Sequence, residues 1–343
     1  MGSSIANNLI IYISSITASL SYCYFISSKL PKGLYRFISL IPIIYLFTIL
    51  PLHCTSIFTT AITFSFTTWL TNFKLIRFAF DLDHSPFHPS HSLLKFITIA
   101  SLPIKSKTAR PTDPNRFRFK LVFQLLIFSI LVKLVSTYKH HIHRNIIMVV
   151  YCGLLFLIID IVADVSNSLL FLLTGLELEP SSDQPYLATS LQDFWGRWNL
   201  MVTNTLRHTV YKPVRSVFSN YKWAPLAGVI VAFVVSGLMH ELFVYELSRE
   251  EPTWEMTWFF VIHGVCVAVE MVVKRCLVGG RWRLPEFVAR LLTVGFVAAT
   301  GMWLFFPPLI KSRLDVRILE EYTSVINFVK VIFFNTLMSL KFM

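Results

Sequence analysis

The sequence is short of charge, and acidic residues are missing from its first quarter. Only 15% of the 343 residues are charged, and no Asp or Glu precedes Asp81. A water-soluble domain carries about a quarter charged residues and separates its apolar positions with polar ones. The low charge and high apolar content therefore exclude a soluble enzyme and a disordered chain.

Cysteine is also scarce, and its spacing is uninformative for metal or disulfide chemistry. The chain has five cysteines, no two of which form a CxxC pair, and all lie in or beside apolar runs. This pattern excludes a disulfide-framed secreted protein and predicts no zinc site. We interpret the cysteines as packing residues and expect no metal.

Several catalytic motifs are absent from the chain. No GxSxG nucleophile elbow occurs. The segment that begins at His240 has Val244 where the HExxH motif of zinc proteases needs its second histidine. The ten histidines form no HxxHH box, and none has an Asp after four intervening residues. These absences argue against a serine hydrolase, an intramembrane zinc protease, a di-iron desaturase and a soluble-type glycerolipid acyltransferase.

Long apolar runs dominate what is present. Hydrophobic residues make up 55% of the chain, which contains 31 Phe and has a mean hydropathy of +0.62. Runs of about twenty apolar residues are long enough to cross a bilayer as helices, and their lack of alternation argues against a β-barrel. We predict an all-α polytopic membrane protein with about 8–9 transmembrane helices. The candidate spans are 8–26, 36–53, 55–73, 117–137, 146–164, 224–245, 254–273, 288–310 and 323–340.

The positive charge predicts an orientation in the membrane rather than a nucleic-acid partner. The net charge is +12, and its basic residues lie mainly in loops between apolar runs. Basic loops stay at the cytoplasmic surface. The loops 27–35, 74–116 and 274–287 then share one side, and the acidic Glu246–Glu251 loop lies on the other. The basic segment 139–144 also falls on that far side, against the rule.

An ionisable residue within an apolar span is a functional candidate, and His240 is the sharpest example. It lies about sixteen residues into its span, roughly 24 Å along the helix axis. Ser236 and Gly237 share its face and would let a neighbouring helix or a ligand approach closely. An imidazole buried among apolar groups stays uncharged near pH 7, as a general base must be. The alternative is a structural histidine bonded to another helix.

A second candidate is the aromatic segment Ser190-Leu-Gln-Asp-Phe-Trp-Gly-Arg-Trp-Asn199. Trp195 and Trp198 are suited to the membrane interface, and Arg197 to pairing with phosphate. Asn199 offers a neutral amide that can hold a carbonyl oxygen as it becomes negative. The alternative is an interfacial amphipathic helix with aromatic anchors.

Three further polar residues lie within apolar spans. Asp160 and Asp164 are four residues apart on one helix face, where they would relay protons, bind a cation, or bond loop backbone near the membrane surface. His263 is interpreted as a packing or substrate-lining residue rather than the base. Asp160 and Asp164, together with His240, could form a proton path, so a proton-coupled membrane transporter is an alternative function.

Two segments resemble one known family. Residues 190–203 and Val235-Ser-Gly-Leu-Met-His-Glu-Leu242 are similar to the plant wax synthases and their sterol-acylating relatives, within the membrane-bound O-acyltransferase superfamily. Supporting similarity covers 69–80, 102–105, 210–215 and 252–260, within a resemblance that spans about residues 10 to 310. The family pattern Phe-Trp-Gly-Arg-Arg-Trp-Asn has a second Arg that this chain lacks after Arg197. On a continuous helix, that deletion turns every later residue by about 100°.

The resemblance implies one membrane-bound O-acyltransferase domain over residues 1–343, with its helices enclosing a buried reaction chamber. The stretches 81–116 and 177–223 would lie outside the membrane or at its surface. The implied enzyme sits in the endoplasmic reticulum membrane, as a multi-pass protein. It transfers a fatty acyl group from acyl-CoA, as co-substrate, to a long-chain fatty alcohol, with a sterol as the alternative acceptor. No other cofactor is expected, and neither is nucleic acid.

The resemblance also implies roles for six residues. His240 matches the superfamily histidine and Asn199 the motif asparagine, which makes these two the expected catalytic residues. The expected substrate-binding residues are Trp195, Arg197, Trp198 and His263. No covalent acyl-enzyme is needed, in agreement with the missing nucleophile elbow.

Overall fold

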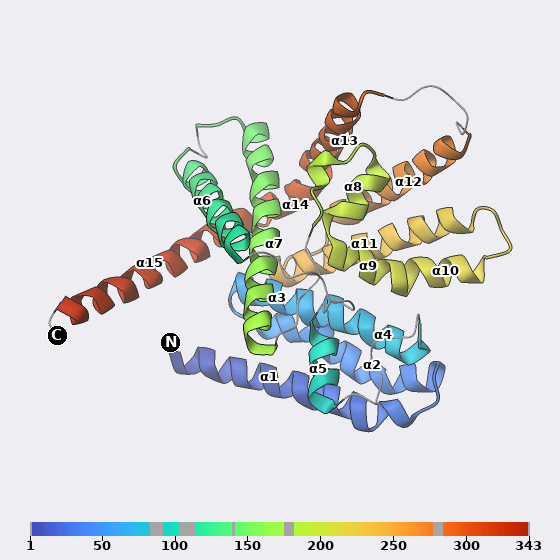
Figure 1. Cartoon of the computed structure of the whole chain (residues 1–343), viewed down its shortest axis with the longest axis horizontal. Helices are drawn as coiled ribbons and strands as arrows, with labels where there is room; N and C mark the ends of the chain where they lie inside the picture. The colour runs from blue at the N-terminus through green and yellow to red at the C-terminus, as the bar shows by residue number, and fades with distance from the viewer. Residues whose placement is uncertain are drawn as a thin grey trace.

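The computed structural model describes residues 2–82, 92–102, 114–138, 141–174, 182–276 and 284–341, and within these ranges it contains helices and no strands (Figure 1). The predicted all-α fold is confirmed for these residues. The elements, in chain order, are α1 (Gly2–Phe25), η1 (Ser27–Lys29), α2 (Leu34–Ile49), η2 (Leu50–His53), α3 (Ile57–Thr63), η3 (Phe64–Thr71), α4 (Asn72–Phe80), α5 (Leu93–Ser101), α6 (Pro114–Tyr138), α7 (Arg144–Thr174), η4 (Pro185–Leu187), α8 (Leu191–Trp198), α9 (Leu200–Leu206), η5 (Arg207–Tyr211), α10 (Lys212–Val217), α11 (Ala224–Ser248), α12 (Glu255–Cys276), α13 (Glu286–Thr300), η6 (Gly301–Phe305), α14 (Phe306–Lys311) and α15 (Leu314–Lys341).

Six helices in the described ranges are long and apolar enough to cross a membrane, so the chain is a multi-pass membrane protein. They are Leu34–His53, Phe119–Tyr138, Arg144–Ser168, Ala224–Ser248, Glu255–Cys276 and Glu286–Lys311. The other three predicted spans are also helical, in α1, in the continuous rod from α3 to α4, and in α15. The rod is rich in Thr, and α15 is charged along its first half. The predicted total of 8–9 spans is therefore not confirmed.

An antiparallel hairpin of α11 and α12 forms the centre of the molecule (Figure 1). Glycines bring the two helices together at two levels. A Cβ on Gly237 would lie 2.9 Å from Cα of Thr257, and one on Gly264 would lie 2.7 Å from Cβ of Phe233. Small residues permit this close approach between apolar helices. The hairpin places the start of α11 and the end of α12 at the same end of the molecule.

Among the described residues, three segments wind as π-helix: η3, η5 and η6. A π-turn adds one residue to an α-helical path and so re-aims the side chains around it. All three segments contact the central hairpin, η5 against α11, η6 against α12, and η3 through a ring contact between Trp69 and His240. The distortions therefore converge on one region of the fold.

Two basic residues from the acid-free first quarter are buried against backbone carbonyls. Lys74 Nζ donates to the carbonyl oxygens of Ile99 and Leu102, at 2.6 and 2.5 Å, and so binds the C-terminal end of α5. Arg36 donates to the carbonyls of Leu30 and other residues around the turn that precedes α2. Unpaired helix-end carbonyls thus supply the negative partners that this region lacks in side chains.

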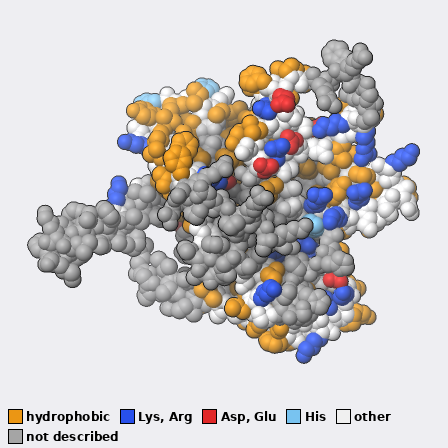
Figure 2. All heavy atoms as spheres, in the orientation of Figure 1, with side chains coloured by type: hydrophobic (Ala, Val, Ile, Leu, Met, Phe, Trp, Pro, Cys, Tyr) orange, Lys and Arg blue, Asp and Glu red, His pale blue; other side chains and the backbone are white. Residues whose placement is uncertain are grey.

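Another group of basic side chains lies where α12 ends, among them Lys274 and Arg275. Figure 2 shows many blue side chains on the side where α10 and α12 end, together with others elsewhere on this face. The opposite end of the hairpin carries the acidic residues Glu250 and Glu251 in the loop between α11 and α12. This polarity agrees with the orientation predicted from the loop charges.

Candidate active site

His240 lies on α11, one turn beyond Ser236, and its ring is half-buried. Its Nδ1 is 2.8 Å from the carbonyl oxygen of Ser236. A carbonyl oxygen only accepts, so Nδ1 carries the hydrogen, and the neutral ring keeps its lone pair on Nε2. No described residue donates a hydrogen bond to that Nε2. When the ring is neutral, this geometry leaves Nε2 as a proton acceptor, which is what a general base requires.

Aromatic rings from three elements surround His240. Phe260 of α12 stacks on it with ring centres 4.2 Å apart, and Trp69 of η3 meets it edge-on at 4.9 Å. Phe305 of η6 approaches to 6.1 Å. Two of the three rings belong to π-helical segments. The resulting environment is apolar, and it suits an acyl chain or a fatty alcohol better than a charged group.

The residues on either side of His240 fix its position against α12. Gly237 lies against the backbone of Thr257, which confirms that this small residue admits a neighbouring helix. Glu241, only 5% exposed, accepts hydrogen bonds from the backbone N–H groups of Trp254, at 2.7 Å, and Thr257, at 3.1 Å. It therefore caps the start of α12. The role of Glu241 was not predicted from the sequence, although an acidic residue in an apolar span was a sufficient signal.

The aromatic segment forms α8. This helix lies along α12, with its first residues near the basic end of α12 and its later residues nearer the middle of α12. Lys274 Nζ donates to Ser190 Oγ at 3.1 Å, and the Gln192 N–H donates to Glu270 Oε2 at 3.2 Å. Further along, Trp195 Nε1 donates to His263 Nδ1 at 2.9 Å. Trp195 also lies 5.5 Å from Phe260, the ring that stacks on His240. The two motifs predicted from sequence are therefore separated by a single side chain.

His263 is completely buried, and both of its ring nitrogens are used. Nδ1 accepts from Trp195, so Nε2 carries the hydrogen and donates to Thr300 Oγ1 at 2.8 Å. The Thr300 hydroxyl in turn donates to the Phe296 carbonyl at 2.8 Å. This chain of bonds joins α8, α12 and α13. His263 therefore positions Trp195, and its predicted contact with substrate stays a prediction.

Arg197 and Trp198 have other partners than the rings around His240. Arg197 Nε is 2.6 Å from Asp193 Oδ1, and its guanidinium is 3.8 Å from Asp183. The hydrogen bond to Asp193 and the charge of both carboxylates raise the pKa of Arg197. Trp198 stacks on Phe194, with ring centres 5.4 Å apart. Arg197 is thus already paired, and a phosphate would have to compete with two carboxylates for it.

Asn199 separates α8 from α9 in an extended conformation, with φ −142° and ψ 95°. Its Oδ1 accepts from the Val202 N–H at 3.1 Å and so caps α9. Val202 and Leu206 of that helix pack in one cluster with Trp69 and Met239. Because the helix already ends at Trp198, the missing Arg does not turn the later residues along a continuous helix. Capping uses the amide oxygen, and the NH₂ group remains available as a donor.

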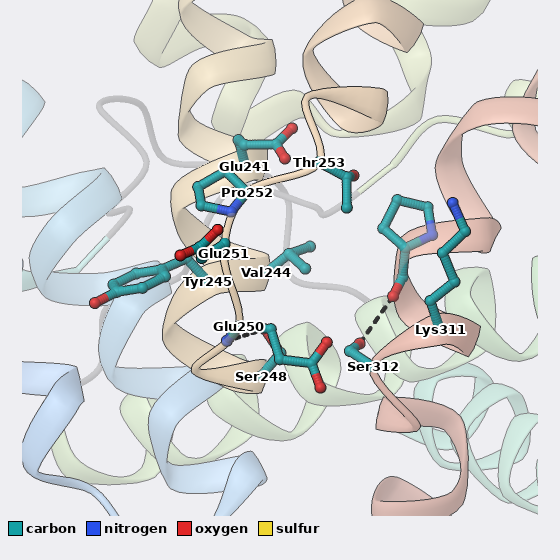
Figure 3. Close-up of a pocket in the computed structure, with 11 residues that line it drawn as sticks. Glu241, Val244, Tyr245, Ser248, Glu250, Glu251, Pro252, Thr253, Lys311 and Ser312 are labelled. Carbon is teal, nitrogen blue, oxygen red and sulfur yellow. Dashed lines mark hydrogen bonds between the residues drawn. The ribbon is translucent and has the colours of Figure 1, made fainter.

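Two hollows lie among the described residues, and neither is lined by His240. One, shown in Figure 3, is about 30 Å³ and lies between the end of α11, the following loop and α14, beside Glu241. That volume suits one water molecule and not an acyl chain. The other is a surface hollow of about 490 Å³ at the basic end of α12, lined among others by Arg197 and Lys274. The predicted buried reaction chamber is therefore not confirmed.

Asp160 and Asp164 form an ion cluster between α6 and α7. Lys120 Nζ lies 3.1 Å from Asp160 and 2.8 Å from Asp164. Gln124 and Ser182 also donate to Asp160, at 2.7 and 3.3 Å. These bonds hold the two helices together, and none of them involves His240. In the ranges that the structure describes, no group of three or more His, Cys, Asp or Glu is arranged to hold a metal ion.

These features define a class of protein: a multi-pass membrane protein that presents a histidine among aromatic rings within its helices. Residues 178–262, which contain Trp195, Asn199 and His240, match the membrane bound O-acyl transferase family. The chain belongs to this family, as its similarity to full-length relatives shows.

Two of these relatives have assigned activities in their names. The long-chain-alcohol O-fatty-acyltransferase of Simmondsia chinensis is 41% identical over 333 residues, which cover 93% of this chain and 94% of that protein. The acyl-CoA–sterol O-acyltransferase 1 of Arabidopsis thaliana is 36% identical over 327 residues, 90% of this chain and 92% of that protein. The resemblance to wax synthases and their sterol-acylating relatives is thereby confirmed.

Proposed function

We propose that this chain transfers a fatty acyl group from acyl-CoA to the hydroxyl of a long-chain fatty alcohol and so forms a wax ester. The observation that carries the proposal is the free Nε2 of His240, inside the segment that matches the acyltransferase family. The name of the Simmondsia chinensis relative, similar over nearly the whole of both chains, supports the long-chain alcohol as acceptor.

The proposed reaction needs one base and no covalent enzyme intermediate. The alcohol O–H gives its proton to His240 Nε2 as the oxygen attacks the thioester carbonyl carbon. The carbon–sulfur bond then breaks, and the leaving sulfur takes the proton back from His240, which yields free coenzyme A and the ester. The Asn199 NH₂ group is proposed to steady the carbonyl oxygen during the attack.

The two substrates are proposed to arrive from different directions. A fatty alcohol enters from the lipid, and charged acyl-CoA comes from the basic end, where Lys274 and the basic residues of 207–222 can meet its phosphates. The course of α8 along α12, from Ser190 to Trp195, supports a path from that end toward His240. Trp195, Arg197, Trp198 and His263 are the residues proposed to line it, and opening it requires the rings around His240 to separate.

A sterol is the second candidate acceptor, because the Arabidopsis thaliana sterol acyltransferase is 36% identical to this chain. A proton-coupled transporter has less support, because the ion pairs of Lys120 engage both Asp160 and Asp164. We further propose that the chain works as a single domain with 8–9 spans in the endoplasmic reticulum membrane. No cofactor besides acyl-CoA as co-substrate is proposed.

A microsomal assay with radiolabelled palmitoyl-CoA tests the proposal, with hexadecanol and a sterol supplied in turn. We expect label in wax ester from the wild type and a loss of about 10²- to 10⁴-fold in His240→Ala, the range for a lost general base. His141→Ala is the matched control, because His141 is exposed and lies outside the central hairpin. Ester formation undiminished in His240→Ala would remove His240 as the base, and label only in sterol ester would change the acceptor.

A further inference from the structure

The indole N–H of Trp69 is a buried donor without an acceptor. The residue is only 6% exposed, and its Nε1 has no hydrogen-bond partner. Indole nitrogen can donate but cannot accept, so only an incoming oxygen or nitrogen would satisfy it. Its cluster consists of apolar side chains, among them Phe64, Phe73 and Leu206. Native proteins seldom leave such a donor unpaired, and exceptions call for an explanation.

The explanation offered by the geometry is a ligand at His240. Trp69 is in ring contact with His240, with centres 4.9 Å apart and planes at 84°. It lies in the π-helical segment η3, and π-turns within helices occur frequently at functional sites. One unpaired donor and one unpaired acceptor, the Trp69 N–H and the His240 Nε2, thus belong to neighbouring rings. A reacting thioester and alcohol would present an acceptor for the first and a donor for the second.

We propose that Trp69 Nε1 donates a hydrogen bond to the carbonyl oxygen of the acyl thioester and holds that oxygen as it becomes negative. This inference rests on the proposed acyl transfer and adds a residue to it. The attacking alcohol oxygen forms its bond to the carbonyl carbon and transfers its proton to His240. The carbonyl π electrons move onto the oxygen that faces Trp69 and return when the carbon–sulfur bond breaks. A donor fixed in an apolar site stabilises such a charge strongly.

Trp69 supplements Asn199 in this role. The Asn199 Oδ1 is occupied in capping α9, whose residue Leu206 packs in the same cluster as Trp69. The two donors therefore come from elements that meet beside α11, and an oxyanion commonly receives two donors. Trp69 lies outside the residues 178–262 that match the family model, although it begins the segment 69–80 that resembles the family. Its assignment follows from burial and contact alone.

Trp69→Phe tests the inference, because it keeps an aromatic ring and removes the N–H. We expect kcat to fall about 100-fold in the palmitoyl-CoA and hexadecanol assay, with KM for both substrates within twofold of wild type, because the bond strengthens only as charge develops. Trp303→Phe is the matched control, because Trp303 also lies in a π-helical segment but is 66% exposed. The Trp303→Phe variant should keep the activity of the wild type.

The outcomes separate this inference from the proposed function. Ester synthesis by the wild type that is lost in His240→Ala but retained within threefold in Trp69→Phe would overturn the role of Trp69 alone. A loss in Trp69→Phe that appears in KM with kcat unchanged would also overturn it, because it indicates ground-state packing. No ester from the wild type would overturn both proposals. If Trp69→Phe proves unstable in detergent, benzothienylalanine at position 69 removes only the N–H, and the same fall in kcat is expected.

Discussion

The oxygen and the NH₂ group of the Asn199 side chain have different roles. Its oxygen caps α9, and its NH₂ group is the part that the proposed reaction uses. An aspartate would cap the helix equally well but would place a negative oxygen where the proposed mechanism needs a donor. The two tasks of the residue can therefore be separated by substitution.

We expect Asn199→Asp to retain the stability of the wild type and to lose at least about 10-fold in kcat, since a carboxylate repels the developing oxyanion. Asn199→Ala should lose activity and also about 1 kcal/mol of stability, the usual value of an N-cap. Thermal unfolding in detergent and the ester assay measure the two effects. An Asp variant with full activity would confine Asn199 to its capping role.

At the scale of whole elements, the packing of α11 against α12 fixes the position of His240. His240 is held on one side by the contact of Gly237 with Thr257 and on the other by the capping bonds of Glu241. Because Phe260 lies one turn into the same interface, any separation of the helices changes the environment of the His240 ring. The spacing of the hairpin is thus part of the candidate site.

Gly237→Ala should push the hairpin apart, because its new Cβ would lie 2.9 Å from the Thr257 backbone. Overpacking of this kind costs about 1–3 kcal/mol, and we expect ester synthesis to fall as the Phe260 contact is displaced. Gly295→Ala is the opposite case, with nothing within 4 Å of the added atom. There the substitution should stabilise the helix by up to about 1 kcal/mol. Equal melting temperatures for the two variants would contradict this account.

The hairpin carries different charges at its two ends, with the basic residues Lys274 and Arg275 at the end of α12 and the acidic residues Glu250 and Glu251 in the loop before α12. Cys276 is the exposed cysteine among the five and stands at the basic end. It therefore reports which face of the membrane that end occupies. The proposed entry of acyl-CoA requires this face to be cytoplasmic.

In intact microsomes, whose cytoplasmic face is outermost, a membrane-impermeant maleimide should label Cys276 and should not label Cys276→Ser. In that background, Glu250→Cys should react only after the membrane is permeabilised, because the acidic loop lies at the opposite end. Mass spectrometry of the labelled protein measures both. The reverse pattern would invert the topology and remove the proposed route of acyl-CoA to the site.

Several features of this protein could be predicted from its sequence alone, because the forces behind them act between residues that are near one another in the chain. Apolar runs of bilayer length predicted the helices, and loop charges predicted an orientation for the loops of the hairpin. The position of His240 within an apolar span made it a candidate functional residue. The same locality explains why Gly237 could be expected to admit a neighbour. None of these inferences depends on which helices meet.

Other features were decided only by the tertiary structure, because they depend on contacts between distant segments. The meeting of Trp69 with His240, the bonding of His263 to Trp195 and the capping of α12 by Glu241 each join separate elements. π-turns leave no periodic signal in a sequence of nearly uniform hydropathy. The direction in which the Trp69 side chain points could therefore not be predicted from the sequence. Whether a polar atom within a membrane helix is paired or left unpaired is settled by packing, and that pairing distinguishes His240 from His263.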